Sequence, residues 1–124
     1  MRILVVEDDT VLAAALTRAL GQAAHSVDLV DNGEDADRAL KLGSYDLVVL
    51  DIALPRMDGW EATLAIKADP ELAWTPIVAL TAHALESDRR RSVEVGCADF
   101  DTKPVDYPRL LEKIERLLLV GAVV

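Results

Sequence analysis

The chain has 124 residues, enough for one domain with its own core, and 52% of them are hydrophobic and 28% charged. The net charge of −9, from 22 acidic and 13 basic residues, argues against direct binding to nucleic acid, which needs a basic face. Acids at positions 7 to 9 argue against a signal peptide, and the lack of a long apolar run argues against a membrane span. The single cysteine, Cys97, indicates a reducing compartment. We therefore expect a single soluble cytoplasmic domain over 1–124.

Short β-rich runs alternate along the chain with helical patterns. The predicted strands cover 2–6, 26–30, 46–51, 76–81 and, more weakly, 98–102. The predicted helices cover 9–21, 31–43, 59–69, 84–96 and 106–119. Asp9 or Thr10 can cap the first helix, and Gly21, Gly43 and Gly96 can end the first, second and fourth.

Five strand–helix units with nearly unbroken apolar strands predict an α/β fold, in which a doubly wound parallel sheet is covered by helices on both faces. The pattern predicts the order of the elements along the chain, not the order of the strands in the sheet. The first helix has two apolar stripes, which suit either a broad buried face or a docking face for a partner helix.

Polar groups follow four of the predicted strands at their carboxyl ends, the edge at which open parallel sheets bind ligands. Glu7 and Asp8 follow the first strand, Asp51 ends the third, Thr81 ends the fourth and Lys103 follows the fifth. Three carboxylates brought together repel one another unless a cation lies between them. A hard divalent cation with oxygen ligands is the natural partner, and Mg²⁺ suits best because it also accepts phosphate oxygens.

Such a site is prepared for a further anion. A phosphoryl group would find a metal, an ammonium group and a hydroxyl around a carboxylate nucleophile, which is what phosphoryl transfer requires. Asp51 would then become an acyl phosphate.

Four segments, "ILVVEDD", "YDLVVLDIALPRMDG", "TPIVALTAHA" and "GCADFDTKP", occur in an order and spacing that resemble the receiver domain of two-component response regulators, over essentially the whole chain. The resemblance, strongest to stand-alone regulators of the chemotaxis type, implies a flavodoxin-like five-stranded sheet in the order 2-1-3-4-5 with five helices. It implies that Asp51 accepts a phosphoryl group from a histidine kinase or a phosphotransfer protein. Such a chain is a regulatory phosphoacceptor in signal transduction, catalysing only its own phosphorylation and dephosphorylation.

The resemblance also assigns roles to single residues around Asp51. Asp8 would be a direct Mg²⁺ ligand, Glu7 would act mainly through water, and the backbone carbonyl of Ala53 would be a further ligand. Ala53 and His83 would tune the lifetime of the acyl phosphate by controlling the approach of water.

Three further residues match the family's phosphate-binding lysine and its two switch residues. Lys103 would bind the phosphoryl group, and the bond from Lys103 to Pro104 would be cis. The Thr81 hydroxyl would turn toward the phosphoryl group, and Phe100 would rotate into the space that it leaves. The surface of the fourth helix, fifth strand and fifth helix would change, so that binding to an unidentified protein partner is controlled.

Other protein classes fit the residues less well. A receiver domain from a hybrid histidine kinase is the main alternative, because "ALTAHA" also occurs there. An aspartate-nucleophile phosphatase of the haloacid-dehalogenase type needs a second acid where Ala53 stands. A flavin or nucleotide carrier needs hydroxyls or glycines where the chain has "EDD". A DNA-binding regulator would need a second domain or a basic face.

Overall fold

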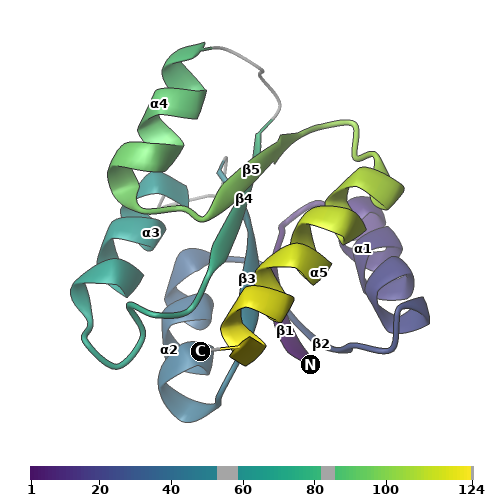
Figure 1. Ribbon diagram of the computed structural model, residues 1–124, viewed down its shortest axis with the longest axis horizontal. Coiled ribbons are helices and arrows are strands. Elements are labelled where there is room, and N and C mark those ends of the chain that lie inside the picture. The colour runs from purple at the N-terminus through teal and green to yellow at the C-terminus, as the bar shows by residue number, and fades with distance from the viewer. Residues whose placement is uncertain (53–58, 82–85, 124) are drawn as a thin grey trace.

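A computed structural model describes residues 1–52, 59–81 and 86–123 (Figure 1). Within these ranges five strands alternate with five helices, as predicted. Their bounds are β1 Arg2–Val6, α1 Thr10–Gln22, β2 Ser26–Val30, α2 Gly33–Leu42, β3 Leu47–Asp51, α3 Gly59–Ala68, β4 Ile77–Thr81, α4 Glu86–Val95, β5 Asp99–Thr102 and α5 Tyr107–Val123.

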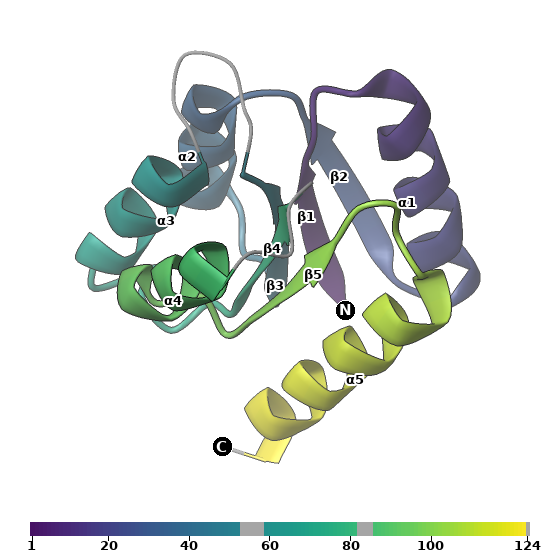
Figure 2. The same cartoon turned by 90° about the horizontal axis from the view of Figure 1, so that it is seen from above.

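The strands form one parallel sheet in the order β2-β1-β3-β4-β5. Helices α2, α3 and α4 cover one face, and α1 and α5 cover the other (Figure 2). The predicted doubly wound α/β class is therefore confirmed, and so is the strand order that the resemblance implied. Within the described ranges, no helix is both long and apolar enough to cross a membrane.

The core consists of two apolar layers, one on each face of the sheet. All five residues of β3 and all five of β4 are buried, which explains their unbroken apolar runs. Because side chains alternate between faces, Val49 contributes to the layer beneath α1 and α5, and Leu50 to the layer beneath α2 and α3. Asp51, the next residue, points to the α1 and α5 side, at the end of a rigid strand.

The first helix begins as predicted and ends later than predicted. Asp9 caps it, since its Oδ1 accepts hydrogen bonds from the N–H groups of Val11 (3.0 Å) and Leu12 (3.2 Å). The prediction that Gly21 ends the helix was wrong, because the helix runs on to Gln22. The left-handed residue that reverses the chain is Ala24, with φ of 68°.

Helix α1 buries one of its two apolar stripes and half-buries the other, which confirms a broad buried face. The buried residues are Ala13, Leu16 and Leu20. Leu12 packs against the same core layer from the second stripe. Gly96, with φ of 97°, lies directly after α4, as predicted.

Candidate functional site

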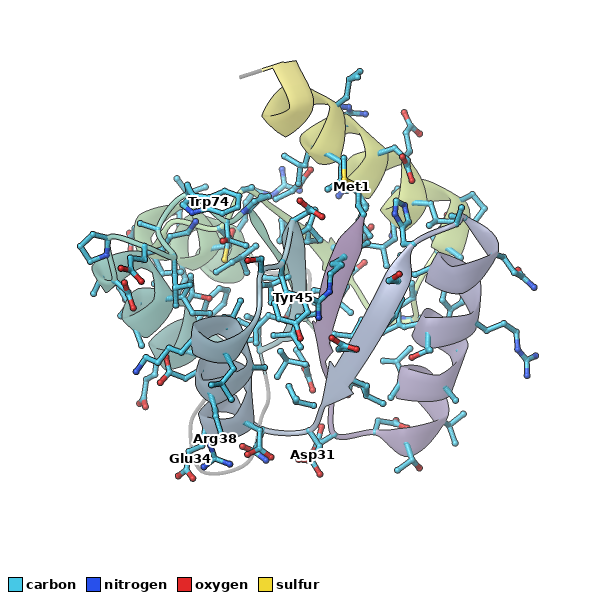
Figure 3. The ribbon with its side chains drawn as sticks, turned by 90° about the horizontal axis from the view of Figure 1, so that it is seen from below. Met1, Asp31, Glu34, Arg38, Tyr45 and Trp74 are labelled. Carbon is cyan, nitrogen blue, oxygen red and sulfur yellow. The ribbon has the colours of Figure 1, made fainter. Side chains whose placement is uncertain are left out.

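The carboxyl ends of the strands bring most of the predicted site residues to one edge of the sheet. Asp51 is the last residue of β3 and pairs in register with Leu80, so Thr81, the end of β4, follows immediately beside it. Glu7 continues β1, and its N–H donates a 3.0 Å hydrogen bond to the carbonyl of Val30 in β2. Figure 3 shows the two ends of the sheet: Asp31 and Glu34 lie at the edge formed by the carboxyl ends of the strands, and Met1 and Trp74 lie at the opposite edge.

Three acidic side chains meet at this edge. Carboxylate oxygens of Glu7, Asp8 and Asp51 all lie within 4.8 Å of one another. Glu7 and Asp51 are buried, with side chains 1% and 3% exposed, whereas Asp8 is exposed. The sequence-based prediction that these acids converge is therefore confirmed as a matter of geometry.

Lys103 places its ammonium group between the two buried acids. Its Nζ lies 3.2 Å from Oε2 of Glu7 and 3.2 Å from Oδ1 of Asp51. Burial disfavours the charged ammonium, but Asp51 and Glu7 outweigh burial and raise the pKa of Lys103. One cation is thus shared by two buried carboxylates, while the third acid remains open to solvent.

Glu7 is buried beside both Asp51 and Lys103. Burial raises its pKa to about 7; a 3.1 Å hydrogen bond from the N–H of Asp9 and the ammonium of Lys103 oppose this rise, and Asp51 adds to it. Its Oε2 atom is buried and has the ion pair with Lys103 but no well-aligned hydrogen bond. An under-satisfied carboxylate oxygen facing two other carboxylates is a donor set that suits a hard cation such as Mg²⁺.

Thr81 and Phe100 lie on neighbouring strands and on the same face of the sheet. Thr81 is 5% exposed, and its carbonyl accepts a 2.8 Å hydrogen bond from the N–H of Lys103. Phe100 is half-buried and pairs in register with Ala79, two residues before Thr81. The Lys103–Pro104 bond is cis, as the resemblance implied. Ala53 and His83, the predicted rate-tuning residues, lie outside the described residues.

Asp101 is an acid near the site that the sequence did not single out. Its side chain is 3% exposed and accepts hydrogen bonds from Nε (3.1 Å) and Nη2 (2.6 Å) of Arg109, with Nζ of Lys113 at 3.7 Å. Burial alone would raise the pKa of Asp101, but these cations and the N–H of Thr102 lower it. The pair holds α5 against β5 next to Lys103. In the sequence, the only sign of this contact is that Asp99 and Asp101 lie two residues apart in a strand, and that Arg109 and Lys113 lie four residues apart in the helix that follows.

The comparisons with known proteins identify relatives over the whole chain. A family model described as "Response regulator receiver domain" matches residues 3–115. The transcriptional regulatory protein TcrA of Mycobacterium tuberculosis is 38% identical over 123 residues, which are 99% of this chain and 48% of that protein. CusR of Escherichia coli K12, another transcriptional regulatory protein, is 36% identical over 100% of this chain and 54% of its own length. The chain thus spans about half the length of these relatives.

Solved structures with the same fold include receiver domains of histidine kinases. One is the signal receiver domain of a signal transduction histidine kinase from Syntrophus aciditrophicus, with a TM-score of 0.88 and 36% identity over 94% of this chain and 89% of that one. Another is the receiver domain of a sensor histidine kinase from Pseudomonas aeruginosa PAO1, with a TM-score of 0.87 and 34% identity over 94% of this chain and 96% of that one. The latter is described with a magnesium ion coordinated in its active-site cleft.

Proposed function

The chain belongs to the response regulator receiver family, and on that basis we propose that it is a phosphorylation-controlled interaction module whose phosphoacceptor is Asp51. The observation that carries the proposal is the position of the Asp51 carboxylate. It is held at the end of a fully buried strand, with a shared ammonium group 3.2 Å away and two further acids alongside. Receiver domains are regulatory proteins rather than enzymes acting on other substrates.

Mg²⁺ is the cofactor that this donor set favours. Asp8 and Asp51 would bind it directly, Glu7 would act mainly through water, and the backbone carbonyl of Ala53 would complete the protein ligands. When bound, Mg²⁺ neutralises the carboxylates and polarises the incoming phosphoryl group.

The chain's own residues account for the rest of the transfer. A carboxylate oxygen of Asp51 attacks the phosphorus, a new O–P bond forms, and the P–N bond to the donor imidazole breaks with its electron pair returning to the ring. The ammonium of Lys103, already beside Asp51, stabilises the negative charge on the phosphoryl oxygens. Burial of Asp51 and Glu7 keeps these interactions strong, because little water screens them.

The switch would follow from two side chains on one face of the sheet. The hydroxyl of Thr81 would turn toward the phosphoryl group, and Phe100 would rotate inward. Ala79 is the register partner of Phe100 and the smallest residue of β4. Its small side chain supports this movement, because it leaves room beside the ring. The change would alter the surface formed by α4, β5 and α5, and Ala53 and His83 would tune how long it lasts.

The proposed upstream partner is a histidine kinase or a histidine phosphotransfer protein, and the proposed downstream partner is another protein. We propose no direct contact of this domain with nucleic acid, in keeping with its charge of −9. The curated relatives that match it are named as transcriptional regulators and are about twice as long. We propose the stand-alone regulator favoured by the sequence. A hybrid-kinase receiver is the alternative, because the solved structures that match include receiver domains of histidine kinases.

The proposal is tested by incubation with acetyl phosphate, with and without Mg²⁺, followed by intact-mass measurement. A gain of one phosphoryl group that requires Mg²⁺ and is lost in Asp51→Asn is expected. Asp46→Asn is the matched control, because Asp46 directly precedes the same strand at its opposite end and accepts a hydrogen bond from the N–H of Arg2. A phosphoryl gain that persists in Asp51→Asn would contradict the proposal, and steady turnover of small phosphate esters would support the phosphatase alternative.

A further inference from the structure

Two basic side chains contact the half-buried aromatic ring of Phe100. Cζ of Arg89 lies 5.2 Å from the ring centroid, and Nζ of Lys113 lies 5.9 Å from it. Arg89 belongs to α4 and Lys113 to α5, the two helices that flank β5 (Figure 1). Both distances are within the range of about 6 Å in which a cation is attracted to the face of an aromatic ring.

The fold explains why both helices reach one ring. In the sheet register Asp99 pairs with Val78 and Phe100 with Ala79, so the Phe100 side chain lies on the α4 side and Asp99 on the α5 side. Strand β5 is an edge strand and pairs only with β4. Its open side leaves the carbonyl of Phe100 free to accept a 2.7 Å hydrogen bond from Nζ of Lys113.

The two cations are held differently. Lys113 is anchored, since its Nζ also lies 3.6 Å from Asp99 and 3.7 Å from Asp101, and its side chain is only 22% exposed. Arg89 has an exposed side chain, and its guanidinium group forms no ion pair with the described side chains of residues 1–52, 60–81 and 89–119. The contact with the Phe100 ring is therefore what holds Arg89 against β5. Because Arg89 lies in the first half of α4, the same contact ties this part of the helix to the strand.

We propose that Arg89 and Lys113 are positioning residues that hold Phe100 in its half-exposed orientation and so set the resting state of the switch. The inference rests on the proposed function, in which the ring turns inward after phosphorylation. We take the inward turn, into the space that the Thr81 hydroxyl leaves, to carry the ring away from both cations, so each contact favours the resting orientation. Removing either cation should shift the equilibrium toward the inward state without touching the phosphorylation site.

Phe100 is the only phenylalanine in the chain, so biosynthetic incorporation of 4-fluorophenylalanine places one ¹⁹F label on this ring. The ¹⁹F spectrum is followed as fluoroberyllate is added at constant Mg²⁺. In Arg89→Gln and Lys113→Gln the resting resonance should shift, and half-conversion should need about two- to fivefold less fluoroberyllate, as expected for the loss of one partly exposed cation–π contact. Arg89→Lys keeps a cation and should retain most of the wild-type behaviour.

Arg90→Gln is the matched control, because it removes an exposed arginine from the next position of α4 and should change neither the resonance nor the midpoint. The inference is overturned if Arg89→Gln titrates with the wild-type midpoint, or if Arg90→Gln lowers the midpoint equally. Lys113 also donates a hydrogen bond to the Phe100 carbonyl in β5, so Lys113→Gln can destabilise the fold. If that variant folds poorly, the result for Arg89→Gln decides the test. A wild-type protein whose resonance does not respond to fluoroberyllate with Mg²⁺ would instead overturn the proposed function, and the switch role with it. An unshifted resting resonance in Arg89→Gln would overturn the ring contact itself.

Discussion

Replacing Lys103 by Met would remove the cation shared by Glu7 and Asp51 while keeping a long, unbranched side chain. Each Nζ–O distance is 3.2 Å, which corresponds to a gross attraction of about 5 kcal/mol per contact at an effective dielectric constant of about 20. Most of this is offset, because the ammonium regains its hydration when unfolded and because Glu7, with its pKa of about 7, can take up a proton instead.

We therefore expect Lys103→Met to lower the free energy of unfolding by about 2 kcal/mol in the absence of divalent cations. For a chain of 124 residues this corresponds to a fall in Tm of about 8 °C. The assay is thermal and urea unfolding followed by circular dichroism at pH 7.5, first with EDTA and then with Mg²⁺. Mg²⁺ should stabilise the variant more than the wild type, because the variant's carboxylates lack their counter-charge.

Lys41→Met is the matched control. Its Nζ lies 2.9 Å from Asp37, closer than Lys103 is to either acid, yet both side chains are substantially exposed. An exposed ion pair contributes little, so Lys41→Met should leave the unfolding midpoint unchanged. The reasoning is refuted if Lys103→Met unfolds at the wild-type temperature in EDTA, or if Mg²⁺ stabilises it no more than it stabilises the wild type.

Four further predictions concern stability and reactivity. Gly21→Ala should stabilise the protein by about 0.5–1 kcal/mol, because Gly21 lies inside α1 with nothing within 4 Å of an added Cβ; a lowered urea midpoint would contradict this. Gly96→Ala should destabilise the protein by about 2 kcal/mol, because φ is 97° and the added Cβ would lie 3.2 Å from Lys67; an unchanged or raised urea midpoint would contradict this. The pKa of Asp101 is lower in the folded than in the unfolded protein, so its carboxylate stabilises the fold fully above the unfolded pKa of about 3.9, and this stabilisation is lost as the pH falls through the folded value. Asp101→Asn should therefore lower the urea midpoint at pH 7. A difference in urea midpoint between variant and wild type that fails to shrink below about pH 4 would refute this. Burial raises the pKa of the Cys97 thiol, so iodoacetamide at pH 8 should modify it far more slowly in the folded protein than in urea, and equal rates would show the thiol to be accessible.

Much of the fold was predictable because it depends on local pattern. The apolar runs of β3 and β4 are long enough to be recognised without any tertiary information, and Asp9 was one of the two candidates for the cap of the first helix, with Thr10. The same reasoning failed at Gly21. Glycine favours the end of a helix, but the reversal occurs at Ala24, where hydrogen bonds from Ala24 to Gly21 and from His25 to Leu20 close the turn ahead of β2.

The candidate site shows the same division. The acids and Lys103 were predicted to meet because the carboxyl ends of parallel strands share one edge, which follows from topology alone. The pKa of Glu7 was not predictable, because it depends on how deeply the side chain is buried and on which atoms surround it. Asp101 was missed for a similar reason, since its importance arises from its contact with Arg109, a residue of the next helix.

The sequence by itself therefore determined the α/β alternation, the edge of the sheet that holds the candidate site and the identity of the residues gathered there, because these depend on residue type and on spacing along the chain. Only the tertiary structure decided that Lys103 is shared between two buried carboxylates and that Arg89 and Lys113 converge on Phe100. The physical reason is that such contacts join elements remote in sequence, and their strength depends on distance and burial, which no local pattern specifies.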